Sequence, residues 1–151
     1  MPTFKEILEN NHSNIDELGI TLKKPATSKD IAKLETFVKC KLPQDIIDFY
    51  RFSNGINTYD WLFQILPIEE IFENGIVNQA FCFAEYMIYS DEWRIQVKDE
   101  KEYSITNSNH GADKTVVLTH SIKEFFESYL KGGLFGNNGL YHWYEDKKAS
   151  A

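Results

Sequence analysis

Cysteine is scarce in this 151-residue sequence, and its two cysteines, Cys40 and Cys82, lie far apart without a CxxC spacing. This usage favours two free buried thiols in a cytoplasmic protein over a disulfide or a metal site. The four histidines also lack the HxxxH, HxH and HExxH spacings of metal sites. We therefore expect neither a metal nor a cofactor.

Long apolar runs are missing as well. No uncharged apolar stretch approaches the ~20 residues that a membrane helix needs. The first residues, MPTFKEILENN, do not show the basic start and apolar run of a secretory signal. We therefore expect a cytoplasmic protein without a membrane partner.

Basic residues are scarce in one part of the chain. Residues 60–102 contain ten acidic residues against three basic ones, and they carry the whole net charge of −7. Such a field repels nucleic-acid phosphates and attracts a basic partner, so we expect no direct binding of DNA or RNA. A solvated surface that only aids solubility is the alternative interpretation.

Helical signals lie toward the two ends of the chain. Residues Phe4–Asn11 favour a short helix, and a polar connection is expected over residues 12–25. Thr27 and Asp30 resemble a capping box, and the residues behind them repeat at the spacing of one buried helical face, with Ile31, Leu34 and Val38. Ser121 and Glu124 form a second capping box, at the start of a helix that ends at residue 132.

The stretch from Leu42 to Gly55 carries the boundary signals of one helix. Pro43 suits the first turn, where its missing N–H would have no partner. Leu42 should end the preceding helix, because the residue before a proline disfavours helical geometry. Asn54 and Gly55 should close the helix, with Gly55 in a left-handed conformation. All four are therefore expected to be structural residues.

Strand signals occupy the middle of the chain. The segment WRIQV alternates, which places Trp93, Ile95 and Val97 on one face. Strands are expected at Trp61–Leu66, Phe81–Tyr89, Trp93–Lys98, Tyr103–Thr106 and Thr115–Thr119, with one helical turn at Pro67–Phe72. The sequence thus predicts a single α+β domain over residues 1–151. Its sheet would be mixed, mostly antiparallel and of about five or six strands, with N-terminal helices and a C-terminal helix packed on it.

The catalytic alternatives are weak. Lys39 and Lys41 flank Cys40 and would lower the pKa of its thiol. Cys40 is, however, expected near the C-terminal end of a helix, where the helix dipole disfavours an anion. The run GGLFGNNG follows a helix and lacks the Lys-Ser/Thr of a phosphate-binding loop, so it favours a flexible connector. The aromatic tail YHWYE should pack back onto the domain or join a partner surface. We expect no enzyme.

The order of these signals resembles the SUKH superfamily, which includes the yeast cell-wall-synthesis regulators and many bacterial immunity proteins. The resemblance rests on Leu42-Pro43, the apolar helix closing at Asn54-Gly55, the segment LPIEEI at Leu66–Ile71, and the Ser121 helix with Phe125-Phe126. It covers about residues 26–130 and leaves the Gly-rich loop and aromatic tail at 131–151 unmatched.

The resemblance implies a binding protein. Bacterial members of this size are typically immunity proteins that neutralise a cognate toxin, often a nuclease or deaminase domain. Nuclease toxins tend to be basic, so an acidic inhibitor can compete for their phosphate-binding surface. An intracellular regulator or scaffold linked to cell-wall synthesis, as in the fungal members, is the alternative.

The candidate partner surface combines aromatic anchors with flanking acids. Its members are Asp60, Trp61, Tyr89, Asp91, Glu92, Trp93, Asp99 and Glu100. The sequence leaves open whether the chain forms a homodimer.

Overall fold

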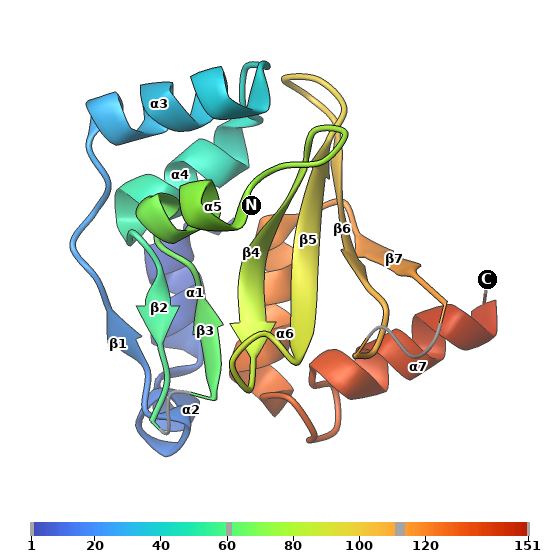
Figure 1. The fold of residues 1–151 in the computed structure, drawn as a ribbon. Helices are drawn as coiled ribbons and strands as arrows, with labels where there is room; N and C mark the ends of the chain where they lie inside the picture. The colour runs from blue at the N-terminus through green and yellow to red at the C-terminus, as the bar shows by residue number, and fades with distance from the viewer. Residues whose placement is uncertain (1, 60–61, 111–113, 151) are drawn as a thin grey trace.

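The computed structural model describes residues 2–59, 62–110 and 114–150. Its helices pack against one antiparallel sheet (Figure 1), which is the α+β fold expected from the sequence. The helices are α1 Phe4–Asn10, α2 His12–Leu18, α3 Ser28–Val38, α4 Gln44–Phe52, α5 Ile68–Asn74, α6 Ile122–Gly132 and α7 Leu140–Ser150. The strands are β1 Thr21–Leu22, β2 Ile56–Asn57, β3 Phe63–Ile65, β4 Ala80–Tyr86, β5 Asp91–Val97, β6 Tyr103–Asn107 and β7 Val116–Thr119.

The strands described lie in the sheet in their chain order, from β1 at one edge to β7 at the other. Every neighbouring pair is antiparallel. The sheet has more strands than expected, because β1 and β2 are only two residues long and show no alternation in the sequence. The strand expected to begin at Trp61 begins, among the described residues, at Phe63.

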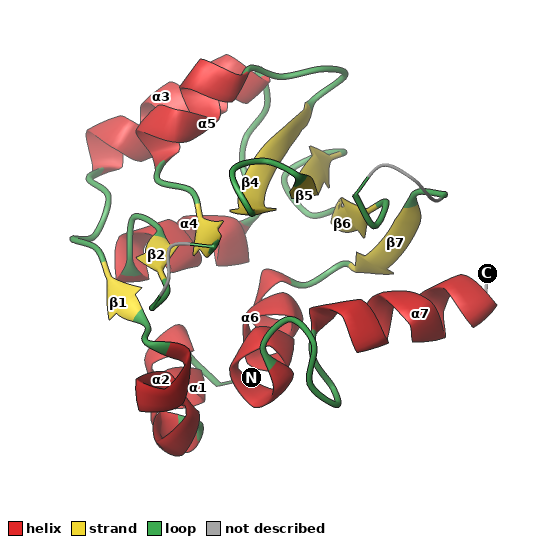
Figure 2. Ribbon diagram, turned by 60° about the horizontal axis from the view of Figure 1, so that its bottom comes forward, coloured by secondary structure: helices red, strands yellow, loops and turns green. Residues whose placement is uncertain are grey.

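One face of the sheet, the inner face, packs on helices. Figures 1 and 2 show α1, α4 and α6 on this side, while α7 lies beside β7. Phe83 of β4 contacts Phe125 of α6 with ring centroids 5.0 Å apart, and Phe63 of β3 stacks on Tyr129 at 4.3 Å. Aromatic side chains from sheet and helix therefore form the centre of the core.

The opposite face, the outer face, is polar over β4, β5 and β6. Trp93, Ile95 and Val97 point inward and are buried, which confirms the predicted alternation of β5. The intervening side chains, Glu92, Arg94 and Gln96, therefore stand on the outer face. A bulge at Phe83 in β4 shifts the pairing register, so that Cys82 lies opposite Arg94 and Glu85 lies opposite Glu92.

The stretch between Leu42 and Gly55 is architectural, with two changes from the prediction. Leu42 does not end the preceding helix, because α3 ends at Val38 and Lys39 is its left-handed C-cap. Helix α4 follows Pro43 as expected, but it ends at Phe52, before Gly55. Gly55 has φ +99° in the bend that leads into β2. Asn54 caps the next helix, because its Oδ1 accepts the Ile68 N–H of α5 at 2.9 Å. Asn54 and Gly55 thus connect α4 to β2 and α5 and do not close α4.

Two helices lie where none was predicted. Helix α2 occupies part of the expected polar connection, and its side chains are only partly buried or exposed. Helix α7 contains the aromatic tail, and its Leu140 and Tyr144 are buried. The tail therefore packs back onto the domain, which was one of the two expectations for it.

Candidate partner-binding surface

Two of the predicted partner residues are not on the surface. Trp93 is 0% exposed and contacts Phe125 of α6, since it shares the inner face with Ile95 and Val97. Asp91 is 3% exposed, because β5 begins at Asp91, two residues before the expected start at Trp93, and the turn lies at residues 87–90. The prediction of Trp93 as a surface anchor and of Asp91 as a flanking surface acid is therefore wrong.

The remaining predicted residues separate into two groups. Tyr89 and Glu92 belong to the β4–β5 hairpin, whereas Asp99 and Glu100 are exposed in the turn after β5. A seven-residue strand separates these positions, a distance of about 20 Å. Asp60 and Trp61 lie outside the described residues. The structure therefore brings only Tyr89 and Glu92 together.

The β4–β5 turn holds Tyr89 in an uncommon backbone conformation. Met87, Ile88 and Tyr89 have φ values of 54°, 52° and 62°, so three successive side-chain-bearing residues are left-handed. This geometry is rare, above all for a β-branched residue such as Ile88. The buried carboxyl group of Glu85 accepts the Tyr89 N–H at 3.2 Å and so ties the turn to β4.

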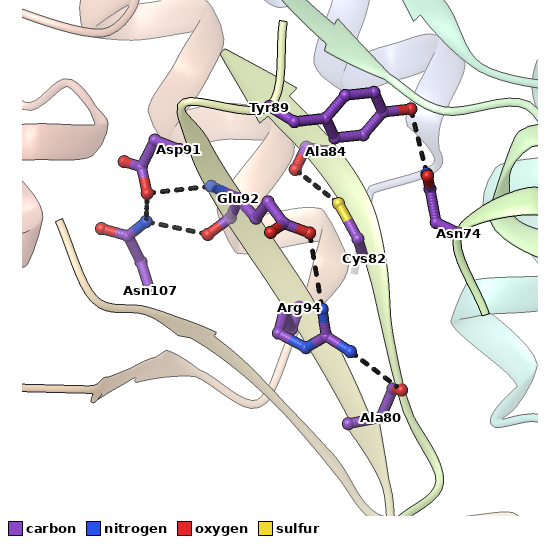
Figure 3. A network of polar contacts seen from close by, with 9 residues as sticks. All are labelled: Asn74, Ala80, Cys82, Ala84, Tyr89, Asp91, Glu92, Arg94 and Asn107. Atoms are coloured by element: carbon purple, nitrogen blue, oxygen red, sulfur yellow. Dashed lines mark hydrogen bonds and ion pairs between the residues drawn. The ribbon is translucent and has the colours of Figure 1, made fainter. Parts of the chain in front are cut away.

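Tyr89 folds back toward α5 (Figure 3). Its hydroxyl donates to Glu70 Oε2 at 3.1 Å and accepts from Asn74 Nδ2 at 3.0 Å. Partial burial and the neighbouring Glu70 carboxylate raise the pKa of Tyr89 to about 12, so the hydroxyl stays protonated at neutral pH. The ring is thereby fixed on the outer face next to carboxylates.

Three glutamates belong to this region: Glu70 bonds the Tyr89 hydroxyl, Glu85 bonds the Tyr89 N–H, and Glu92 lies opposite Glu85 in β5. Burial, with a further contribution from the Glu70 charge, raises the pKa of Glu85 above its usual range. Glu92 pairs with Arg94 at 3.4 Å, and Arg94 also donates to the Ala80 carbonyl at 3.2 Å (Figure 3). We call Glu70, Glu85, Tyr89 and Glu92 the acidic hairpin face. A hollow of about 220 Å³ lies beside it, lined by Glu92, Arg94 and His110 among others.

Asp91 sits beneath this surface as the centre of a buried hydrogen-bond network. Its Oδ1 accepts from the N–H groups of Glu92 at 2.8 Å and His110 at 3.0 Å, and from Asn107 Nδ2 at 3.0 Å. The Tyr141 hydroxyl of α7 donates to Oδ2. A buried carboxylate with this many donors is a satisfied structural group, and it fixes the start of β5 against the C-terminal helix.

Sequence reasoning missed Glu70 and Glu85 as members of the acidic hairpin face. The signal for Glu85 was present, since it is a charged residue inside the apolar run FCFAEY, and a charged side chain there needs partners. Glu70 could not be placed, because its position depends on how α5 packs beside β4. Arg94 was assigned to the correct face by the alternation of WRIQV.

The cysteines show no arrangement for catalysis. Both thiols are free; Cys82 is buried, as expected, while Cys40 is only half-buried just beyond the end of α3. Burial raises the pKa of the Cys82 thiol, which disfavours the thiolate. The Cys40 Sγ donates to the Lys41 carbonyl at 3.3 Å. Within residues 2–59, 62–110 and 114–150, no group of three or more metal-binding side chains is placed to hold an ion.

Comparison with known sequences identifies a family. The sequence model of the SMI1 / KNR4 family (SUKH-1) matches residues 25–128, which include α3, α4, α5 and the acidic hairpin face and end before α7. No curated protein matches the chain. None of the described helices combines the length and the apolar character needed to cross a bilayer. Because the matched region is more than half of the chain, the protein belongs to the SMI1 / KNR4 family (SUKH-1).

Proposed function

We propose that this protein is an immunity-type binding protein that neutralises a cognate basic toxin domain, of the nuclease or deaminase kind, by covering its surface. The observation that carries the proposal is the acidic hairpin face, where Glu70 accepts the Tyr89 hydroxyl, the buried Glu85 holds the Tyr89 N–H, and Glu92 lies opposite Glu85 on the outer face. Family membership supports it, since the resemblance implies binding proteins of this type.

The charge of this face suits a basic partner. Glu92 is paired with Arg94 and Glu85 is buried, whereas Glu70 forms no ion pair within residues 2–59, 62–110 and 114–150. Asp99 and Glu100 add exposed negative charge at the other end of β5. A negative field of this kind accelerates encounter with a positively charged domain and rejects nucleic acid. A toxin that holds phosphates needs such a positive surface, so an acidic inhibitor can compete for it.

The geometry also suits binding more than turnover. Tyr89 is held by Glu70 and Asn74, and the turn that carries it is held by Glu85. A contact side chain that is already ordered loses little conformational entropy when a partner binds. Aromatic residues in such a position often contribute much of the energy of an interface. Tyr89 and Glu92 are therefore the residues of the predicted partner surface that we retain.

Co-expression tests the proposal. The probe is the C-terminal domain of the protein encoded by the reading frame next to this gene, expressed from an inducible promoter. We expect this domain to arrest growth alone, and we expect co-expression of the present chain to restore growth and to yield a complex of equal stoichiometry. A toxic neighbour that is neither rescued nor bound would contradict the proposal. A neighbour without toxicity would also contradict it and would favour a regulatory role.

A further inference from the structure

Exposed apolar side chains gather at the end of the sheet that carries the β4–β5 turn. Ile88 is 87% exposed, Tyr59 82% and Phe135 71%, and Met87 and Leu62 are also exposed. These five residues, which we call the apolar tip, come from three segments of the chain: the β2–β3 connection, the β4–β5 turn and the loop before α7. Exposed apolar side chains that gather in one region of a globular domain commonly mark an interaction site.

Defined contacts join the three segments of the apolar tip. The Met87 N–H donates to the Leu62 carbonyl at 2.6 Å, which ties the β4–β5 turn to the β2–β3 connection. The ring of Phe135 lies 5.8 Å from that of Tyr86, the residue before the turn, in an edge contact. Between the segments lies a groove of about 310 Å³, lined by Tyr59, Leu62 and Phe135 together with the partly buried Leu134. The tip therefore offers both a projection, at Met87 and Ile88, and a hollow.

The backbone of the turn adds a second, independent observation. Ile88 has φ +52°, although a β-branched residue strongly disfavours positive φ, and its side chain is directed to solvent. Folding alone would be served better by glycine or asparagine at this position. Strained backbone that brings no packing within the chain is typical of a functional contact residue.

The charges around the apolar tip identify the kind of partner. Glu17 lines the groove, and none of its described lining residues is lysine or arginine. The acidic hairpin face adjoins the tip through the turn at residues 87–90. An anionic membrane surface would be repelled by these carboxylates, and a second copy of the chain would place like charges against one another. A basic protein surface is the complementary partner.

We propose that the apolar tip is the anchor of the interface with the basic toxin domain, with Ile88 inserted into an apolar pocket of that domain and the acidic hairpin face against its cationic rim. This proposal rests on the proposed function and adds to it the surface that carries the affinity. Buried apolar anchors set the strength of an interface, whereas a charged rim mainly sets the rate of association.

The test uses the purified chain and the neighbouring-frame domain, with affinity measured by titration and thermal stability measured in parallel. The variant is Ile88→Asn, and the matched control is Val77→Asn, because Val77 is also β-branched and exposed but precedes the other end of β4. Asparagine tolerates positive φ, so Ile88→Asn should keep or raise the melting temperature. Its affinity should fall on the order of tenfold or more, while that of Val77→Asn should not change.

The possible results are distinct. Unchanged affinity of Ile88→Asn, with a wild-type chain that binds, would overturn the inference and leave the proposed function intact. A wild-type chain that fails to bind the toxic neighbour would contradict the proposed function, and the inference would fall with it. A wild-type homodimer that Ile88→Asn converts to a monomer, with toxin binding unaffected, would make the tip a surface for self-association and would also overturn the inference.

Discussion

The hydroxyl of Tyr141 donates a hydrogen bond to the carboxylate of Asp91, and this contact joins the C-terminal helix to the first residue of β5. The two residues are fifty positions apart in the chain, and the family match includes only one of them. The Tyr141 ring also stacks on His110, with centroids 5.6 Å apart. Because Glu92 follows Asp91 directly in β5, the aromatic tail thus helps to hold the strand that carries Glu92.

Tyr141→Phe tests this support. The substitution removes one donor to a buried carboxylate, so the free energy of unfolding should fall by about 1–3 kcal/mol. Burial and the bond to Asp91 raise the pKa of Tyr141, so the hydroxyl remains a donor at neutral pH. Urea unfolding monitored by fluorescence measures the change, with Tyr59→Phe as control because Tyr59 is exposed. Equal midpoints for Tyr141→Phe and the wild type would show that α7 is held by packing alone.

Gly55→Ala tests the bend between α4 and β2. A Cβ atom at residue 55 would lie 2.7 Å from the Ile65 carbonyl oxygen and 2.9 Å from the Pro67 nitrogen, and the φ of +99° is unfavourable for alanine. Strain of this kind costs roughly 1–2 kcal/mol for each residue, before any steric clash is included. We expect a lower melting temperature than for the wild type.

Gly75→Ala is the matched control for this prediction. Gly75 has φ +83°, but a Cβ atom there would meet nothing within 4 Å. The loss of stability should therefore be larger for Gly55→Ala than for Gly75→Ala, and the difference reports the close approach of the backbone at Ile65. Equal losses in thermal unfolding would mean that backbone conformation alone requires glycine at residue 55.

The sequence predicted those parts of the fold whose signals are local. Thr27 and Asp30 form the reciprocal capping box that their spacing indicates, and β5 alternates as the letters WRIQV require. Helix α7 carried no such signal, because LYHWYEDKKAS lacks a regular apolar stripe and its packing against β7 is a long-range property. The end of α4 was misplaced, since an Asn-Gly step is equally compatible with a later bend.

The candidate site was harder to predict than the fold. Trp93 was chosen as an anchor because it is aromatic and next to acids, although its own alternation with Ile95 placed it inward. Glu85 depended on the bulge in β4, which changes the face of every later residue in the strand and cannot be deduced from composition. The left-handed turn at residues 87–89 was read as the end of a strand, because isoleucine and tyrosine favour strands.

The raised pKa of Glu85 predicts a pH dependence of stability. The folded chain keeps the Glu85 proton to a higher pH than the unfolded chain, in which the usual value is 4.5. The contribution of Glu85 to stability is therefore most favourable below that value and falls as the pH rises through the raised folded pKa. Relative to the wild type, Glu85→Gln should become progressively more stable as the pH rises above 4.5.

Urea unfolding at a series of pH values measures this difference. Glu100→Gln, an exposed position in the turn after β5, is the control and should show no such trend. Burial is the larger cause of the raised pKa of Glu85 and the charge of Glu70 a smaller one, so Glu70→Gln should reduce the trend without abolishing it. If the stability difference between Glu85→Gln and the wild type is constant across the pH series, the pKa of Glu85 is the same in the folded and the unfolded chain. That result would contradict the prediction.

The most direct test of the account is the rate at which the chain associates with the neighbouring-frame toxin domain, measured over a range of ionic strength. Glu70→Gln combined with Glu92→Gln should slow association at low salt and flatten its salt dependence. Asp99→Asn combined with Glu100→Gln, at the far end of β5, removes the same formal charge and should have a smaller effect. Equal rates for all three proteins at low salt, or no association of the wild-type chain, would contradict the claim that the acidic hairpin face receives a basic toxin domain.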